Sequence, residues 1–364
     1  MRDKADQFDR LRLIRSPNIG PVTYRQLIER FGSAAAAIVA LPDLVMRGGG
    51  NKVVLADPRI IEREIAATLA LGANYIFSDD ADYPELLTHL DNAPPAIMYR
   101  GNVSLLSRNP VAIVGARNAS AGACRFARTL AFDLGQSGLA VVSGLARGID
   151  TAAHVGSIDS GTIAVIAGGV DIAYPPENRE LQDAIAERGL LIAEMPPGTE
   201  PRARHFPYRN RIIAGLSLGT VVIEAAPKSG SLITARLAAE AGREVMTIPG
   251  SPLDPRSHGC NQLIREGATL VQNAAEIAEL LRPMDERVTR RAMPSKPAAA
   301  LIDDYGEPDR RAVLDLMGMT YVSVDELVRQ SGASPAVAQM VLLELELAGT
   351  LERGAGGKVR LSYQ

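Results

Sequence analysis

The sequence predicts an α/β fold: an extended Rossmann-like, doubly wound and mainly parallel sheet, flanked by a small helical domain and a winged-helix domain. From about residue 105 to residue 281, short apolar runs rich in β-branched residues alternate with longer amphipathic segments. That alternation is typical of parallel strands covered by helices on both faces. On either side of this region, apolar residues recur at helical spacing. We therefore expect domains at 1–72, 73–282 and 305–364, with a linker at 283–304.

The bulk composition is that of an ordinary globular chain without a general attraction for polyanions. Of the 364 residues, 46% are hydrophobic and 22% are charged, and the formal net charge is −3. A site for a polyanion must therefore be a local patch. Cys124 and Cys260 lie far apart without metal-ligand spacing, so we expect reduced thiols, a cytoplasmic location and no metal. The charged N-terminus and the lack of a long apolar run lead us to expect neither a secretory signal nor a membrane span.

The first domain has the pattern of two short helices around a tight turn. Its apolar stripe is interrupted by the turn at residues 17–21, which contains two prolines and a glycine, and it then resumes at helical spacing. This is the layout of a helix-hairpin-helix module, whose hairpin amides can bind a phosphate. Short helical pairs also serve packing or protein contact, and both interpretations stay open. Residues 75–77 follow as a strand, and the prolines between residues 83 and 101 predict an extended or turning path.

The central region supplies the strands and helices of the sheet in alternation. The predicted strands are at 111–114, 139–142, 162–166, 190–192, 220–223, 244–247 and 268–271. The predicted helices cover 119–136, 149–157, 178–188, 209–218, 231–241 and 273–281. Ligands of such sheets bind at the carboxyl ends of the strands, so the turns after the strands are the candidate site.

The C-terminal region has a winged-helix outline of three helices and a strand hairpin. Its third helix is expected to begin at the cap formed by Ser334 and Pro335. That helix carries Glu344 and Glu346 but no arginine or lysine, which argues against reading of a DNA groove. We expect a protein-contact role or a vestigial one.

The stretch at residues 202–218, RARHFPYRNRIIAGLSL, has the strongest local charge. Its cations are interleaved with aromatic rings and no acid: Arg202, Arg204, His205, Phe206, Tyr208, Arg209 and Arg211. Alternating cations and rings suit a flexible polyanion whose bases can stack. The apolar second half predicts a helix packed on the sheet. The alternative is a solvated loop before a core helix.

Cations from separate turns are expected to converge at one edge of the sheet, although no GxGxxG motif is present and no cofactor is expected. The turn after the first strand supplies Arg117, the second supplies Arg147, and the later turns supply Arg209, Arg211 and Lys228. Glycines beside them permit close approach of backbone to phosphate. The candidate DNA-binding residues are Gly115, Arg117, Ser143, Gly144, Arg147, Gly148, His205, Phe206, Arg209, Asn210, Arg211, Lys228, Ser229, Gly230 and Ser231.

Other polar residues in these turns have structural interpretations. Ser120, Asp150 and Asn178 are expected to cap the helices that follow them. His154 lies one helical turn after Asp150, which allows a carboxylate–imidazole pair, although packing is the commoner role. Glu224, at a strand end, is the natural acid of an enzyme that acts on nucleotides, and a capping or core-edge role is the alternative.

The turn motifs resemble one family, the bacterial DNA-processing protein A (DprA, or Smf) family. The matching blocks span about residues 75 to 282 in order: AIVGARNAS, SGLARGIDTAAH, GGVDIAYPPEN, HFPYRNRIIAGLS, EAAPKSGSLITARLA and IPGSPLDPRSHGCNQLIREGA. The flanking segments are similar to the family's N-terminal sterile-alpha-motif-like module and its C-terminal winged helix, though more loosely.

The resemblance implies an extended Rossmann fold that binds single-stranded DNA, forms homodimers and delivers incoming DNA to the RecA recombinase during natural transformation. It implies no catalytic residue and no membrane partner. Arg117 matches the arginine of the family's glycine-x-arginine motif, which contacts DNA. The loop after Tyr174 is a further contact region in relatives and often carries a lysine, whereas this chain has Pro176 and Glu177 there. A phosphoribohydrolase-like enzyme on the same fold, with Glu224 as its acid, is the alternative.

Overall fold

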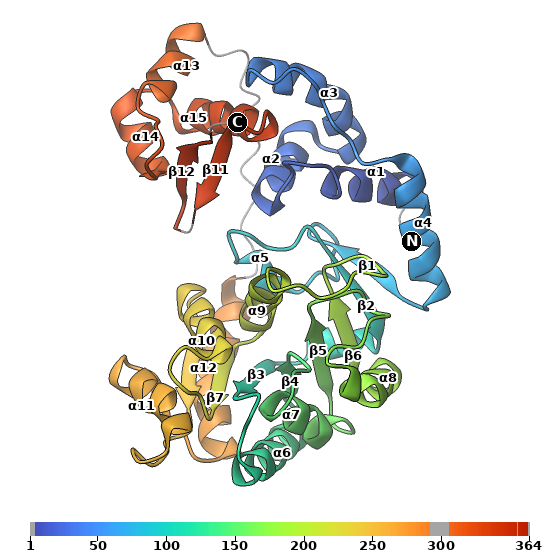
Figure 1. The fold of residues 1–364 in the computed structure, drawn as a ribbon, viewed down its shortest axis with the longest axis vertical. Helices are drawn as coiled ribbons and strands as arrows, with labels where there is room; N and C mark the ends of the chain where they lie inside the picture. Colours follow the sequence, from blue (N-terminus) through green and yellow to red (C-terminus); the bar gives the residue numbers. More distant parts are fainter. Residues whose placement is uncertain (1–3, 292–305, 355, 363–364) are drawn as a thin grey trace. The chain divides into compact units, whose positions relative to one another are not determined.

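The computed structural model describes residues 4–291, 306–354 and 356–362 (Figure 1). The chain forms two compact units, one from residues 1–65 and 295–364, the other from residues 66–294. We call them the end unit and the sheet unit. The predicted fold class is confirmed: a mainly parallel α/β sheet with a helical domain before it and a winged-helix domain after it.

The first half of the end unit is helical, as the sequence predicts. It contains α1 (Lys4–Ile14), α2 (Pro21–Phe31), α3 (Ala34–Arg47) and the start of α4 (Pro58–Ala70). The turn between α1 and α2 is tight because Asn18 adopts a left-handed conformation with φ of 62°. Gly32 ends α2 in the same conformation, and the Ser33 hydroxyl accepts a hydrogen bond from the Ala36 amide to begin α3.

The second half of the end unit is the winged helix. Its elements are α13 (Glu307–Leu314), β10 (Val322–Ser323), α14 (Val324–Ser331), α15 (Pro335–Leu347), β11 (Leu351–Gly354) and β12 (Lys358–Leu361). The three strands form an antiparallel sheet in the order β10-β12-β11. Ser334 caps α15 by accepting a hydrogen bond from the Val337 amide, as predicted.

The sheet unit is built on nine strands in the order β1-β2-β6-β5-β4-β3-β7-β8-β9. The strands are β1 (Asn74–Phe77), β2 (Ala96–Gly101), β3 (Pro110–Gly115), β4 (Ala140–Ser143), β5 (Thr162–Ile166), β6 (Leu190–Ala193), β7 (Gly219–Ile223), β8 (Glu244–Thr247) and β9 (Thr269–Leu270). β3 to β9 are parallel where they pair, and β1 and β2 add an antiparallel edge beside β6. The sequence did not predict β2, because the prolines before it hide a run that pairs with β1 on one side and with distant β6 on the other.

Helices cover both faces of this sheet (Figure 1). Alternate residues of a strand therefore pack in opposite cores. Val111 and Ile113 of β3 pack in one core with α6 (Ala121–Gln136), α7 (Ile149–Ser157) and α12 (Ala274–Arg291). Ala112 and Val114 pack in the opposite core with α9 (His205–Leu216), α10 (Gly230–Glu240) and α11 (His258–Arg265). α8 (Arg179–Arg188) packs on β5 and β6. Short helices complete the unit: α5 (Glu85–Thr88), η1 (Val103–Ser107), η2 (Pro176–Asn178) and η3 (Pro255–Ser257).

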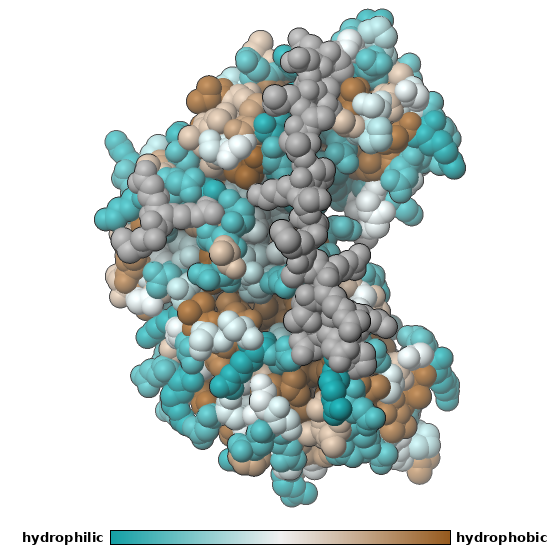
Figure 2. All heavy atoms as spheres, turned by 180° about the vertical axis from the view of Figure 1, so that it is seen from behind, coloured by the Kyte–Doolittle hydropathy of each residue, from teal (hydrophilic) through white to brown (hydrophobic). Residues whose placement is uncertain are grey.

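The segment expected as a linker is partly helical. α12 continues to Arg291, which lies inside the expected linker at 283–304, and the rest of that linker lies outside the described residues. Hydrophilic residues predominate on the face drawn in Figure 2, with hydrophobic ones in separate patches. None of the helices in the described ranges has the length and apolar character to cross a membrane.

Candidate functional site

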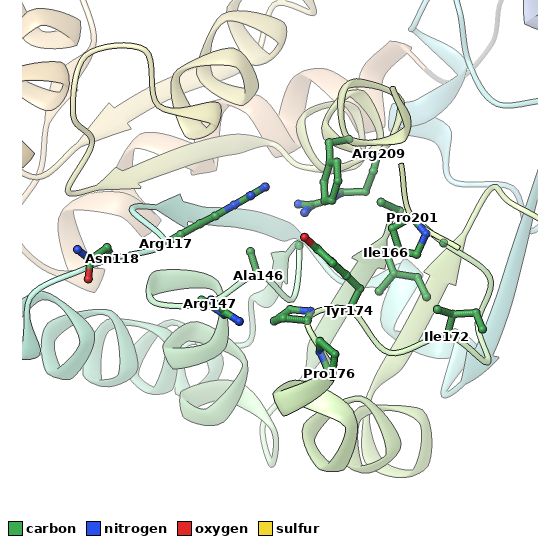
Figure 3. A pocket seen from close by; sticks show the side chains of 15 residues that line it. Arg117, Asn118, Ala146, Arg147, Ile166, Ile172, Tyr174, Pro176, Pro201 and Arg209 are labelled. Carbon is green, nitrogen blue, oxygen red and sulfur yellow. The ribbon is translucent and has the colours of Figure 1, made fainter. Parts of the chain in front are cut away.

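A cavity of about 390 Å³ opens where β3, β4 and β5 end (Figure 3). β3 lies between β4 and β7 in the sheet, so the chain order reverses there, and open α/β sheets bind ligands at such a point. The lining comes from the turns after these strands and from the start of α9. It comprises Arg117, Asn118, Gly144, Ala146, Arg147, Ile166, Ala167, Gly168, Ile172, Tyr174, Pro175, Pro176, Pro201, Phe206 and Arg209.

Two arginines and two aromatic rings form the inner wall. The guanidinium carbon of Arg117 lies 5.2 Å from the centre of the Phe206 ring, and that of Arg209 lies 5.8 Å from it. The Tyr174 and Phe206 rings are 5.7 Å apart. Figure 3 shows the Arg117 and Arg209 side chains extending toward each other across the cavity, with the Tyr174 hydroxyl directed into the same space. Positive charge and flat apolar faces therefore meet in one place.

The glycines of the neighbouring turns let these side chains and loops approach closely. A Cβ atom on Gly144 would lie 1.5 Å from Nη1 of Arg209, so only glycine leaves room for that guanidinium. Gly148 has φ of 74°, and a Cβ there would lie 2.3 Å from the Ala116 carbonyl oxygen. On Gly115 it would lie 1.9 Å from the Ile223 carbonyl oxygen. These glycines pack the turns against one another, whereas the sequence predicted approach to a phosphate.

Arg209 is held by a buried carboxylate. Its Nη1 lies 3.9 Å from Oδ2 of Asp150, and both side chains are about 7% exposed. Burial lowers the pKa of Arg209 and raises that of Asp150, and each partner opposes the shift of the other. Asp150 also accepts a hydrogen bond of 3.3 Å from the Ala146 amide. The prediction that Asp150 caps α7 is wrong, because the cap position is Gly148 and the Asp150 carboxylate turns back to the β4–α7 turn.

Arg147 and Arg117 differ in their counter-ions. Arg147 is paired with Glu177 at the exposed rim, and that hydrogen bond lowers the pKa of Glu177. Arg117 forms none of the ion pairs within 4 Å that occur among residues 4–291. Its nearest ring is Phe206. Arg117 is therefore the cavity cation with the least internal neutralisation.

Arg211 and the Lys228 turn lie elsewhere. Nη2 of Arg211 lies 2.5 Å from Oε1 of Glu194, and both side chains are largely buried. Lys228 is exposed with φ of 69° in the β7–α10 turn, where the Ser229 hydroxyl caps α10. Neither cation lines the cavity, nor do Ser229, Gly230 and Ser231. The structure thus brings together three of the five cations that were expected to converge.

The remaining candidates, His205, Asn210 and Ser143, are buried next to the cavity lining and do not belong to it. α9 begins at His205, four residues before the predicted start, and this places Phe206 on the cavity wall. Burial, with Arg204 and Arg202 nearby, lowers the pKa of His205. Asn210 is buried and does not line the cavity. The Ser143 hydroxyl donates a 2.6 Å hydrogen bond to the Ile113 carbonyl, which ties β4 to β3.

Two further predictions concern helix caps and histidine. Ser120 caps α6 as predicted, accepting from the Ala123 amide at 3.1 Å. Asn178 occupies the cap position of α8 without a side-chain cap bond, and its Nδ2 donates instead to the Leu145 carbonyl at 2.9 Å. His154 packs in the core: its Nδ1 lies 2.7 Å from the Thr162 hydroxyl, and burial lowers its pKa to about 3.

Glu224 has the capping role. Its carboxylate accepts hydrogen bonds from the Ser120 amide at 2.8 Å and the Ser120 hydroxyl at 2.6 Å, so it sits at the N-terminus of α6. Its backbone is in the left-handed region with φ of 48°. It does not line the cavity.

The sequence did not single out several lining residues. Asn118, Ile166, Ile172 and Pro201 carry no chemical signal by themselves. They enter the site because the turns that contain them fold over the ends of β3 and β5. Tyr174 entered the sequence analysis only as the residue before a contact loop of relatives, and the structure makes its ring part of the aromatic wall.

The fold and the site together define a Rossmann-like α/β protein with a cationic and aromatic cavity at the carboxyl edge of its sheet. The chain belongs to the DNA recombination-mediator protein A family, whose model matches residues 74–282. A DprA-like N-terminal HHH domain matches residues 4–67, and a DprA winged helix domain matches residues 292–357. The resemblance inferred from the turn motifs is confirmed, and the relatives are DNA processing proteins.

Individual relatives show the same relationship. The chain is 46% identical over 200 residues to DNA processing protein DprA of Streptococcus pneumoniae, covering 54% of this chain and 71% of that protein. It is 30% identical over 377 residues to protein Smf of Synechocystis, covering 93% and 94%. Among solved structures, DprA of Streptococcus pneumoniae matches with a TM-score of 0.57 and 35% identity, covering 71% of this chain and 97% of that one.

A second structure concerns the single-stranded DNA binding mode of DNA processing protein A from Helicobacter pylori. It matches with a TM-score of 0.53 and 29% identity, and it covers 58% of this chain and 96% of that one.

Proposed function

We propose that this protein binds single-stranded DNA in the cavity at the ends of β3, β4 and β5 and acts as a recombination mediator. The observation that carries the proposal is the cavity wall itself, where the guanidinium carbons of Arg117 and Arg209 lie 5.2 and 5.8 Å from the centre of the Phe206 ring. Arginine guanidiniums bind phosphates, and aromatic faces stack on bases without sequence preference. The binding described for the Helicobacter pylori relative supports this choice of ligand.

The aromatic components favour a single strand over a duplex. Base stacking on a protein ring requires a base that is not already stacked in a helix. Phe206 is partly exposed, and Tyr174 and Tyr208 are about half exposed, so their faces are accessible to bases. Duplex DNA presents only its phosphates to such a concave wall.

The wider role follows from family membership. We propose that the bound strand is protected and passed to the RecA recombinase during natural transformation or other DNA processing. We also propose a homodimer that uses apolar positions late in the sheet unit. Leu253 is 91% exposed and Leu270 is 42% exposed there, so both side chains are accessible to a second copy of the chain.

We further propose that the chain is not an enzyme. The residue best suited to act as an acid, Glu224, accepts two hydrogen bonds from Ser120 and lies outside the cavity lining. Incubation with nucleoside monophosphates tests this, and release of free base would favour a phosphoribohydrolase instead.

Competition between a single-stranded oligonucleotide and its duplex tests the proposed function, with oligomer state read by light scattering in the same samples. We expect the single strand to displace the duplex, and a dimer to bind it. Equal affinity for both forms, or preference for the duplex, would contradict the proposal.

A further inference from the structure

The winged helix of this chain does not present its third helix in the way that a DNA reader does. Eight of the thirteen residues of α15 are buried. Ala338, Val341, Leu342 and Leu345 pack in the core of the winged helix. On another side of the same helix, Met340, Leu343 and Leu347 pack in a second core. A helix that is apolar all round is a buried helix, and a groove-reading helix needs an exposed polar face.

The second core belongs to the helical domain. Met340, Leu343 and Leu347 share it with residues of α1, α2 and α3, among them Leu13, Tyr24, Leu27, Leu41 and Leu44. The backbones also approach closely: a Cβ atom on Gly48, at the end of α3, would lie 2.1 Å from the Glu344 carbonyl oxygen. The two halves of the end unit therefore pack so closely that the contact has no room for a methyl group on Gly48.

The same contact borders the hairpin that resembles a phosphate-binding turn, whose Pro17 and Asn18 are exposed. Nδ2 of Asn18 donates to the Leu347 carbonyl at 3.5 Å, at the C-terminal end of α15. A cavity of about 360 Å³ in this contact is lined by Pro17, Asn18 and Ile19 from that turn, by Gly49 and Gly50 from the turn after α3, and by Leu347, Ala348 and Thr350. The amide-bearing turns of the helical domain thus face the winged helix.

We propose that the winged helix is an intramolecular docking module for the helical domain, and that this contact withholds α15 from DNA. The residue types of α15 support this assignment, because the helix has no arginine or lysine and carries Glu344 and Glu346. Glu344 is buried and Glu346 is paired with Arg353, so α15 offers no cation to a phosphate, and its apolar faces fit a protein partner. DNA binding is then left to the cavity of the sheet unit.

Hydrogen exchange on the full chain tests the contact. Gly48→Ala adds the methyl group that collides with α15, whereas Gly20→Ala is the matched control, since a Cβ there has nothing within 4 Å. We expect Gly48→Ala to speed exchange in α15 roughly tenfold or more, because overpacking a close contact favours its opening. Gly20→Ala is expected to leave α15 unchanged. Unchanged exchange of α15 in Gly48→Ala would overturn the proposal.

A second variant guards against a local effect of Gly48→Ala. Leu343→Ala removes side-chain volume on the helical-domain side of α15, and Gln339→Ala changes an exposed residue of the same helix. We expect only Leu343→Ala to speed exchange in α2 and α3 as well as in α15. Faster exchange in α15 alone would show that the helical domain does not depend on it.

Exchange with DNA present tests whether α15 is withheld. On addition of a single strand or a duplex, we expect no slowing at residues 335–347 of the unsubstituted chain. Slowing there would overturn the proposal. Slowing at residues 115–120 and 205–210 is a separate readout of the proposed function, so failure of one proposal is distinguishable from failure of the other.

Discussion

Replacing Arg117 by alanine is expected to weaken binding of single-stranded DNA far more than replacing Arg147. Arg117 forms none of the ion pairs found within 4 Å among residues 4–291, whereas Arg147 is paired with Glu177. A phosphate that binds Arg117 therefore displaces no internal carboxylate. A phosphate that binds Arg147 must compete with Glu177 for the same guanidinium.

The magnitudes follow from these pairings. A hydrogen bond to a charged group contributes about 1.5–3 kcal/mol, so Arg117→Ala should weaken binding about 10- to 150-fold. The slope of log affinity against log salt should also become shallower by about 0.7, the value for one phosphate contact on a single strand. For Arg147→Ala we expect the affinity to fall about threefold or less, because the Arg147 guanidinium is already paired with Glu177 at the exposed rim.

Fluorescence anisotropy at two salt concentrations measures both effects, using two oligonucleotides of unrelated sequence. Both sequences should lose affinity alike, because phosphates carry no sequence information. Urea unfolding of each variant confirms that the fold is retained. Equal losses for Arg117→Ala and Arg147→Ala, or an unchanged salt slope for Arg117→Ala, would refute this account of the cavity charges.

Three further predictions concern the same unit. Glu177→Gln frees Arg147 and should raise affinity for single strands about two- to threefold at low salt, an effect that salt should abolish; no gain in a titration would show that the pair does not compete with DNA. Gly144→Ala should displace Arg209 and reduce binding about tenfold or more, whereas Gly122→Ala, whose Cβ would meet only Ser120 Oγ at 3.9 Å, should bind normally; equal affinities would contradict the packing argument. His154 has a folded pKa of about 3 against an ordinary 6.5, so the unfolded chain takes up a proton that the folded one excludes, and stability should fall as pH drops from about 6.5 toward 3. From pH 6.5 to 5 the loss should be about 1.6 kcal/mol by urea unfolding, and His154→Gln should lose less over that range.

Much of the sheet could be predicted because its signals are local. β-Branched runs mark β5 and β8 at the residues where the structure has them, and Ile149–Ser157 is helical as expected. β2 could not be predicted, since its pairing with β6 joins residues about 90 positions apart in the chain. A strand without alternating apolar and polar residues gives no indication in its sequence of the strand with which it pairs.

The candidate site could be predicted as a set of turns but not as a set of side-chain directions. Arg117, Arg147, Phe206 and Arg209 meet as expected, because the carboxyl ends of parallel strands share one edge. Arg211 does not join them, since two positions along α9 turn a side chain by about 200° to a different face of the helix, where Glu194 receives it. Only the three-dimensional position of Glu194 shows that.

The contact between α15 and the helical domain shows the same limit on a larger scale. The sequence indicated that α15 lacks the residues for groove reading, through Glu344 and Glu346. It did not indicate the partner of Leu343 and Leu347, because apolar positions on a helix do not say which surface they meet.

The most direct test of the central claim is the affinity of Phe206→Leu for a single strand and for the same strand without bases. If bases stack on the Phe206 ring beside Arg117 and Arg209, the substitution should weaken binding of the normal strand by about 1–3 kcal/mol, or about 5- to 150-fold. The abasic strand, which keeps its phosphates, should bind both proteins almost equally. An equal loss on both strands, or no loss on either, would contradict the claim that this cavity holds single-stranded DNA by its phosphates and its bases.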